Sequence, residues 1–125
     1  MGQETFFIVA TNPMNNQIKN SVQQVVSGKT PFVLVGKEHV DPPRVVFPGS
    51  FNPLHAGHRT IASVAEKIIG GPFFYEISID NVDKPSLNTA DVVRRVNQFD
   101  ANDTVAITQS VTFDKKAILF PGAIF

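Results

Sequence analysis

The stretch Arg44-Val-Val-Phe-Pro-Gly-Ser-Phe-Asn-Pro-Leu-His-Ala-Gly-His58 decides the fold of this chain. It opens with a short apolar run, Arg44–Phe47, which predicts a strand that Pro48-Gly49 ends. Residues 56–69 then have the apolar spacing of a helix, and glycines at 70 and 71 end it. A strand that passes through a tight loop into a helix is the repeating unit of parallel α/β sheets, so the sequence predicts that unit here.

The same alternation continues toward the C-terminus. Phe73–Ile79 and Thr104–Thr108 are β-rich runs, and a helix over 90–99 between them has Thr89 as its predicted N-cap. A short helix over 113–120 follows the last run. Strands and helices that alternate at this spacing pair in parallel through right-handed crossovers. The sequence therefore predicts an α/β fold with a Rossmann-like parallel sheet and helices on both faces.

Each of the two helices of this unit is expected to turn one apolar face toward the sheet. The apolar residues of the first helix are Ile61, Val64, Ala65, Ile68 and Ile69, and those of the second are Val92, Val93, Val96 and Phe99. Residues 122–125 are typical of the opening of a further strand. We therefore expect the domain to continue past the residues given, with this chain cut short at its C-terminal end.

Residues 1–43 are predicted to form an N-terminal extension or the tail of an upstream domain. Within them, 5–11 and Phe32–Val35 read as strands and Asn15–Val26 as a helix, followed by a linker over 37–43 that holds two prolines. Residues 44–125 form the domain that carries the motif.

Composition excludes several classes of protein. The chain has 125 residues, of which 42% are hydrophobic and 18% charged, and these values are typical of one globular domain. Its formal net charge is zero, which argues against general binding to nucleic acid or to a membrane surface. There is no cysteine, no apolar run long enough to span a membrane and no signal peptide, so a soluble cytoplasmic protein is expected.

The loop after the first predicted strand has the features of an anion site. Open parallel sheets bind ligands beyond the carboxyl ends of their strands, where a helix N-terminus offers free N–H groups to an anion. Gly49 permits a sharp turn and close approach, and Gly57 removes a side chain that would block access. His55 and His58 are three residues apart and share a face of the first helical turn. Two imidazoles at this position suit the phosphates of a nucleoside triphosphate, whose transfer needs positioning and charge stabilisation.

The residues Gly49-Ser-Phe-Asn-Pro-Leu-His-Ala-Gly-His58 resemble the G-x-F-x-P-x-H-x-G-H signature of the cytidylyltransferase-like nucleotidyltransferase superfamily. The resemblance extends over about residues 44–125. It implies transfer of AMP or CMP from ATP or CTP to a phosphorylated acceptor with release of pyrophosphate, and Mg²⁺ carried by the triphosphate. Acceptor, base and oligomeric state are left open.

The resemblance also implies roles for particular residues. Lys84, in a loop after the second strand of the unit, matches a family lysine that contacts the acceptor phosphate or the transferring phosphoryl group, and Arg95 lies on a helix that bears an arginine in the family. The implied catalytic residues are His55, His58 and Lys84, and the implied nucleotide-binding residues are Gly49, Ser50, Phe51, Asn52, Gly57 and Arg95. Lys84 as an ordinary exposed lysine, and Arg94 and Arg95 on a solvated helix face, are the alternatives. No metal-binding residues are predicted, because Asp80 and Asp83 in a polar loop are weak evidence for Mg²⁺.

One departure from the family pattern matters. The family carries a second signature of the type Ser-Ser-Thr-x-x-Arg that binds the β- and γ-phosphates, and this chain has none. Ser110-Val-Thr112 with Lys115-Lys116 does not replace it. The alternative to an enzyme is therefore an inactive nucleotide-binding module or fragment. A tRNA synthetase, which shares the H-x-G-H element, is a poor third alternative, because the chain is short and carries no net positive charge for binding tRNA.

Overall fold

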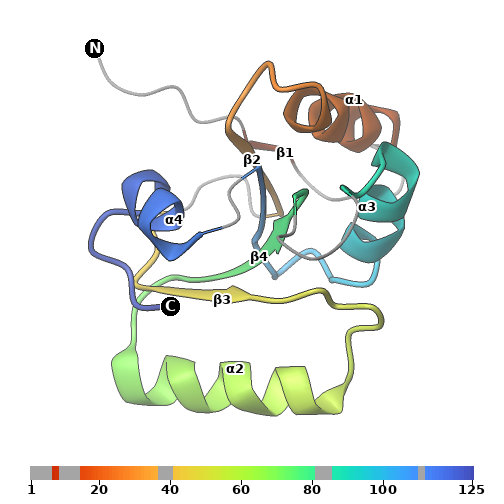
Figure 1. Ribbon diagram of the computed structural model, residues 1–125. Coiled ribbons are helices and arrows are strands. Elements are labelled where there is room, and N and C mark those ends of the chain that lie inside the picture. Colours follow the sequence, from red (N-terminus) through yellow and green to blue (C-terminus); the bar gives the residue numbers. More distant parts are fainter. Residues whose placement is uncertain (1–6, 9–14, 37–40, 81–85, 110–111) are drawn as a thin grey trace.

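A computed structural model describes residues 7–8, 15–36, 41–80, 86–109 and 112–125 (Figure 1). The strands are β1 (Phe7–Ile8), β2 (Phe32–Val35), β3 (Val45–Pro48), β4 (Phe73–Ser78) and β5 (Val105–Thr108). The helices are α1 (Asn15–Val26), α2 (Ala56–Ile69), α3 (Thr89–Val96) and α4 (Phe113–Leu119). Together they form an α/β fold around one sheet, and none of the described helices is long and apolar enough to cross a membrane.

Within the described residues, the sheet has five strands in the order β1-β2-β5-β4-β3. β3, β4 and β5 pair in parallel, which confirms the prediction for the unit that begins at Arg44. β2 pairs antiparallel with β5, and β1 pairs parallel with β2, so the sheet is mostly rather than wholly parallel. Hydrogen bonds of one sheet thus join the segment before residue 43 to the segment after it. The division of the chain into two domains at that point stays a prediction.

Helices cover both faces of the sheet, as predicted (Figure 1). Side chains alternate along each strand, so β4 sends Tyr75 and Ile77 to one face and Phe74 to the other. The larger core lies on the face that carries α1 and α3, and includes Ile18, Val22, Val25, Val92, Val96 and Phe99. The smaller core lies under α4 and consists of Leu34, Val46, Phe74, Ala106 and Phe120.

The inward face expected for α2 is correct only in part, because the predicted residues Ala65 and Ile69 are half-buried but the other three are exposed. Ala62 is the buried residue of this helix, whereas Ile61, Val64 and Ile68 are 58%, 49% and 77% exposed. The helix bounds were predicted correctly because local spacing determines them. Which face is covered depends on what packs against the helix, and β3 is an element that α2 contacts.

The start of α3 differs by one residue from the prediction. Asn88, not Thr89, is the N-cap, and its side-chain oxygen accepts a hydrogen bond from Asp91 N at 2.8 Å. The predicted inward residues Val92 and Val96 are fully buried, and Phe99 is nearly so. Phe99 itself lies in the turn that follows α3 rather than in the helix.

After β5 the chain crosses one face of the sheet as α4, and its last residues then lie beside β3. Ile124 forms a parallel bridge with Val45, and Val46 N donates to Ile124 O at 2.8 Å, where the sequence predicts a strand to open. From β3 the chain winds through β4 to β5 in one direction, and Ile124 lies on the opposite side of β3. The carboxyl end of β3 is therefore a topological switch point, which is the place where open α/β sheets bind ligands.

Candidate active site

The two histidines of the motif cap the N-terminus of α2. His55 is the N-cap residue, and its Nδ1 accepts a hydrogen bond from Gly57 N at 3.1 Å. His58 Nδ1 accepts from His55 N, also at 3.1 Å, so the pair forms a reciprocal capping box. The two rings stack, with centroids 3.8 Å apart and planes inclined by 22°. The sequence predicted that they share a face, but nothing in it indicated that they cap the helix.

These hydrogen bonds fix how the imidazoles present their nitrogens. Because each Nδ1 accepts a backbone N–H, a neutral ring must carry its proton on Nε2, where it is a donor. Burial, and secondarily the neighbouring charge of His55, lower the pKa of His58 below its usual value. At neutral pH His58 is therefore an uncharged ring with an Nε2–H donor at the N-terminus of α2, whose dipole and free N–H groups favour an anion.

Glycines leave room for rings of the motif. A Cβ on Gly57 would lie 3.0 Å from Cε1 of the His55 ring. A Cβ on Gly49 would lie 2.8 Å from Cζ of Phe51, so the group that approaches Gly49 closely is this ring. The approach of an anion to Gly49 stays a prediction.

Phe51 anchors the loop in the core. Its side chain is 1% exposed and packs edge-on against the rings of Phe47, His58, Tyr75 and Phe99, with centroids 4.9–5.6 Å apart. Its backbone has a φ of 48°, a left-handed conformation that non-glycine residues rarely adopt. The side chain is thus part of the core, and only the backbone of Phe51 is left for contact with a nucleotide.

Three side chains from α3 and the turn after it hold this loop. Arg94 Nη1 donates to Asn52 Oδ1 and Arg95 Nη1 donates to Ser50 O, each at 3.1 Å. Arg94 stays largely exposed and Arg95 is half-buried, so the alternative of a solvated helix face is not decided for Arg94. Gln98, which the sequence pattern did not single out, accepts from Leu54 N at 2.7 Å and donates to the carbonyl of Phe51 at 2.6 Å.

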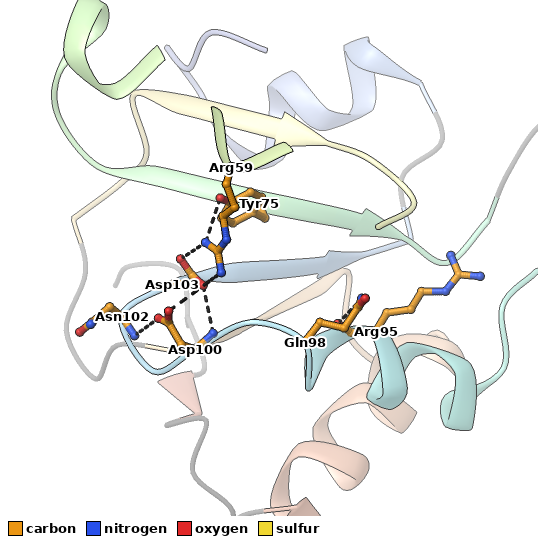
Figure 2. Close-up of polar contacts among 7 residues, drawn as sticks. All are labelled: Arg59, Tyr75, Arg95, Gln98, Asp100, Asn102 and Asp103. Atoms are coloured by element: carbon orange, nitrogen blue, oxygen red, sulfur yellow. Dashed lines mark hydrogen bonds and ion pairs between the residues drawn. The ribbon is translucent and has the colours of Figure 1, made fainter. Parts of the chain in front are cut away.

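Arg59, directly after His58, attaches α2 to the loop before β5 (Figure 2). Its two Nη atoms donate to the two carboxylate oxygens of Asp103 at 2.8 Å each, and Nη1 also donates to Tyr75 Oη at 3.1 Å. The hydrogen bonds to Asp103 raise the pKa of Arg59 further, and burial raises the pKa of Tyr75. A bidentate pair has a fixed geometry, so this contact sets the orientation of the first turns of α2.

The structure brings most of the predicted residues to one place. Gly49, Ser50, Phe51, Asn52, His55, Gly57 and His58 lie in the loop after β3 and the first turn of α2, and Arg95 contacts this loop from α3. Lys84 and Asp83 lie outside the described residues, so the role of Lys84 stays a prediction.

Glu76 was missed by the sequence analysis, and Lys116 was considered only with the segment that does not replace the second signature. Glu76 and Lys116 form an ion pair of 2.9 Å that is almost fully buried. One signal for Glu76 was available in the sequence, namely an acidic residue in the middle of the apolar run Phe73–Ile79.

The described residues do not provide a protein-held metal site. No group of three or more His, Asp or Glu side chains among them is arranged to hold a metal ion. Asp80, one of the two carboxylates that the sequence offers only as weak evidence for Mg²⁺, accepts a hydrogen bond from the Ser86 hydroxyl.

A comparison with protein-family models matches residues 46–117 to the cytidylyltransferase-like family. No significant match was found among the curated proteins or among the solved structures. The match covers more than half of the chain and contains most of β3, together with the motif loop, α2, β4, α3 and β5. The fold, the capped histidine pair at the switch point and this match agree, and the chain belongs to the cytidylyltransferase-like family of nucleotidyltransferases.

Proposed function

We propose that the chain transfers a nucleoside monophosphate, AMP or CMP, from ATP or CTP to a phosphorylated small-molecule acceptor and releases pyrophosphate. The observation that carries this proposal is the capped pair His55 and His58. Each Nδ1 is occupied by a backbone N–H, so the Nε2–H donors are available to phosphate oxygens at the N-terminus of α2. Family membership supports the reaction type.

In this mechanism an oxygen of the acceptor phosphate attacks the α-phosphorus in line. A new P–O bond forms, the bond to the bridging oxygen of the β-phosphate breaks, and pyrophosphate leaves with the electron pair. Negative charge grows on the non-bridging oxygens of the α-phosphate, and Nε2–H donors of His55 and His58 stabilise it. The backbone of residues 49–51 would hold the nucleotide, and Lys84 would neutralise acceptor or α-phosphate charge. When bound with the triphosphate, Mg²⁺ supplies further charge neutralisation.

The first test is isothermal titration of ATP and of CTP, each with Mg²⁺, into the chain and into a His58→Asn variant. An asparagine oxygen can accept the hydrogen bond from His55 N that Nδ1 now accepts, but the variant has no Nε2–H donor. The substitution therefore separates capping from phosphate binding. We expect one nucleotide to bind and its affinity to fall at least tenfold in His58→Asn.

The matched control is His39→Asn, the same change at the third histidine, which the sequence places in the linker. We expect this variant to bind the nucleotide like the wild type. If neither nucleotide bound to a folded wild-type chain, or if His58→Asn bound it unchanged, the proposed site would be wrong. Nucleotide binding without turnover on any phosphorylated acceptor would favour the alternative, an inactive nucleotide-binding module.

A further inference from the structure

A second charged site lies beside the motif loop. A pocket of about 210 Å³ opens at the carboxyl ends of β3 and β4, and its lining includes Gly49, Ser50, Ser78, Arg95 and Lys116. We call it the charged pocket. His55 and His58 do not line it. Gly49 and Ser50 are shared between the charged pocket and the motif loop, so a ligand here would lie next to a nucleotide held by that loop.

An ion pair is part of the lining of the charged pocket. Glu76 on β4 is fully buried and Lys116 on α4 is 7% exposed, and Nζ lies 2.9 Å from Oε1. The other carboxylate oxygen, Oε2, accepts from the hydroxyls of Thr108 at 2.5 Å and Ser78 at 2.8 Å. Burying two charges has a large desolvation cost, and apolar residues of similar volume often give equal or greater stability. Stability alone is therefore a weak explanation for this pair.

Both cations of the charged pocket keep donors for a ligand. Among the described residues, Glu76 is the one charged partner of Lys116. Oε1 of Glu76 makes an ion pair with Lys116 Nζ but has no hydrogen-bond partner, so the N–H donors of Lys116 are not used by it. Lysine carries three N–H donors and arginine five. Arg95 makes one side-chain hydrogen bond in the described part of the chain, to Ser50 O, and its buried Nε has no partner there. Since Glu76 cancels one of the two positive charges, the pocket has a net charge of about +1, which favours an anion.

We propose that the charged pocket binds the phosphate monoester of the acceptor, with Arg95 and Lys116 as its cationic ligands. The proposal rests on the proposed function, and it assigns Arg95 to the acceptor rather than to the nucleotide. The volume supports this assignment, because about 210 Å³ is below the roughly 300–1,000 Å³ of pockets that enclose larger ligands. A pocket of this volume is large enough for a phosphoryl group.

The test uses inorganic phosphate as the probe, titrated at constant ionic strength and followed by calorimetry. The main variant is the double substitution Glu76→Gln/Lys116→Met, because removal of Lys116 alone would leave a buried unpaired carboxylate. The amide oxygen that the Glu76→Gln change provides can still accept from the two hydroxyls. Lys115→Met is the matched control, since Lys115 is the exposed neighbour on the same helix and the change removes the same charge. Arg95→Met tests the other cation of the charged pocket, and because the Arg95 side chain is only half-buried, folding depends less on it.

We expect the double variant and Arg95→Met each to weaken phosphate binding at least tenfold, whereas Lys115→Met and His58→Asn bind it like the wild type. We also expect Glu76→Gln alone, which leaves Lys116 without its counter-charge, to bind phosphate more tightly. A purely structural ion pair would not reverse the effect in this way. The proposal would be overturned if the double variant and Arg95→Met still bound phosphate. It would also be overturned if His58→Asn no longer bound it.

A further titration separates the acceptor phosphate from the triphosphate. We expect phosphate to bind equally well when the site is saturated with a non-hydrolysable nucleotide analogue and Mg²⁺. Competition between the two would assign the pocket to the triphosphate and overturn the acceptor assignment. The two proposals fail separately. Lys116-dependent phosphate binding without any nucleotide binding contradicts the proposed function, and nucleotide binding without phosphate binding contradicts this inference.

Discussion

Replacement of Gln98 by leucine tests whether one side-chain amide holds the motif loop. In the wild type, Gln98 Oε1 accepts from Leu54 N at 2.7 Å, and Nε2 donates to the carbonyls of Phe51 and Arg95 at 2.6 and 3.0 Å. Leucine is similar in size but has no hydrogen-bonding group. Gln98→Leu therefore leaves the Leu54 N–H and the Phe51 carbonyl without a partner.

The expected loss of stability follows from those two groups. An unsatisfied buried donor or acceptor costs about 1–3 kcal/mol. Both hydrogen bonds are half-buried, so the lower part of that range applies to each, and we expect a total of about 2–4 kcal/mol. Phe51 adds to the effect because its left-handed backbone, with a φ of 48°, loses one of the contacts that hold it.

The assay is urea unfolding followed by circular dichroism. With a slope of about 2 kcal/mol per molar urea, a loss of about 2–4 kcal/mol lowers the midpoint by about 1–2 M. The control is Asn97→Leu, one residue earlier, where the side chain is exposed and makes no hydrogen bond within the described part of the chain. We expect the control to change stability by less than about 0.5 kcal/mol. If Gln98→Leu unfolded at the same urea concentration as Asn97→Leu, the role assigned to Gln98 would be wrong.

Three further predictions concern the motif itself. His55→Ala should lower the free energy of unfolding by about 1 kcal/mol, because it removes the N-cap acceptor. His55→Asn keeps an acceptor at the N-cap and should not lower it, and thermal unfolding of both variants would measure the difference. The pKa of His58, measured by NMR titration, should lie below about 6.5 and rise in His55→Asn. Because the pKa of His58 is lower in the folded chain than in the unfolded chain, the unfolded chain binds more protons below about pH 6.5. His58 therefore makes the free energy of unfolding fall as the pH drops below about 6.5, and the loss is complete below the pKa of the folded chain. Gly49→Ala should cost about 1–3 kcal/mol in urea unfolding, because its Cβ would lie 2.8 Å from the fixed Phe51 ring, and an unchanged midpoint would contradict this reading.

Local spacing and turn chemistry were enough to predict most elements. The helix bounds 15–26 and 56–69 and the strand 32–35 agree with the structure, because apolar periodicity and the glycines that end each run act within a few residues. The parallel pairing of β3, β4 and β5 also followed from the sequence, because crossovers of that length constrain neighbouring strands to one direction. The motif loop and its histidines were found for the same reason, since ten consecutive residues carry the pattern.

Tertiary structure alone decided the features that depend on distant residues. The exposure of Ile61, Val64 and Ile68 could not be predicted, because periodicity shows which residues share a face but not whether anything covers it. The antiparallel pairing of β2 with β5 joins segments separated by a long stretch of chain.

The polar contacts around the site show the same limit. Gln98 reaches Leu54 across 44 positions, and Lys116 meets Glu76 only after α4 has packed on the sheet. A polar side chain carries no mark of its partner in the sequence, because the free energy of a buried hydrogen bond or ion pair depends on geometry that only the folded chain creates.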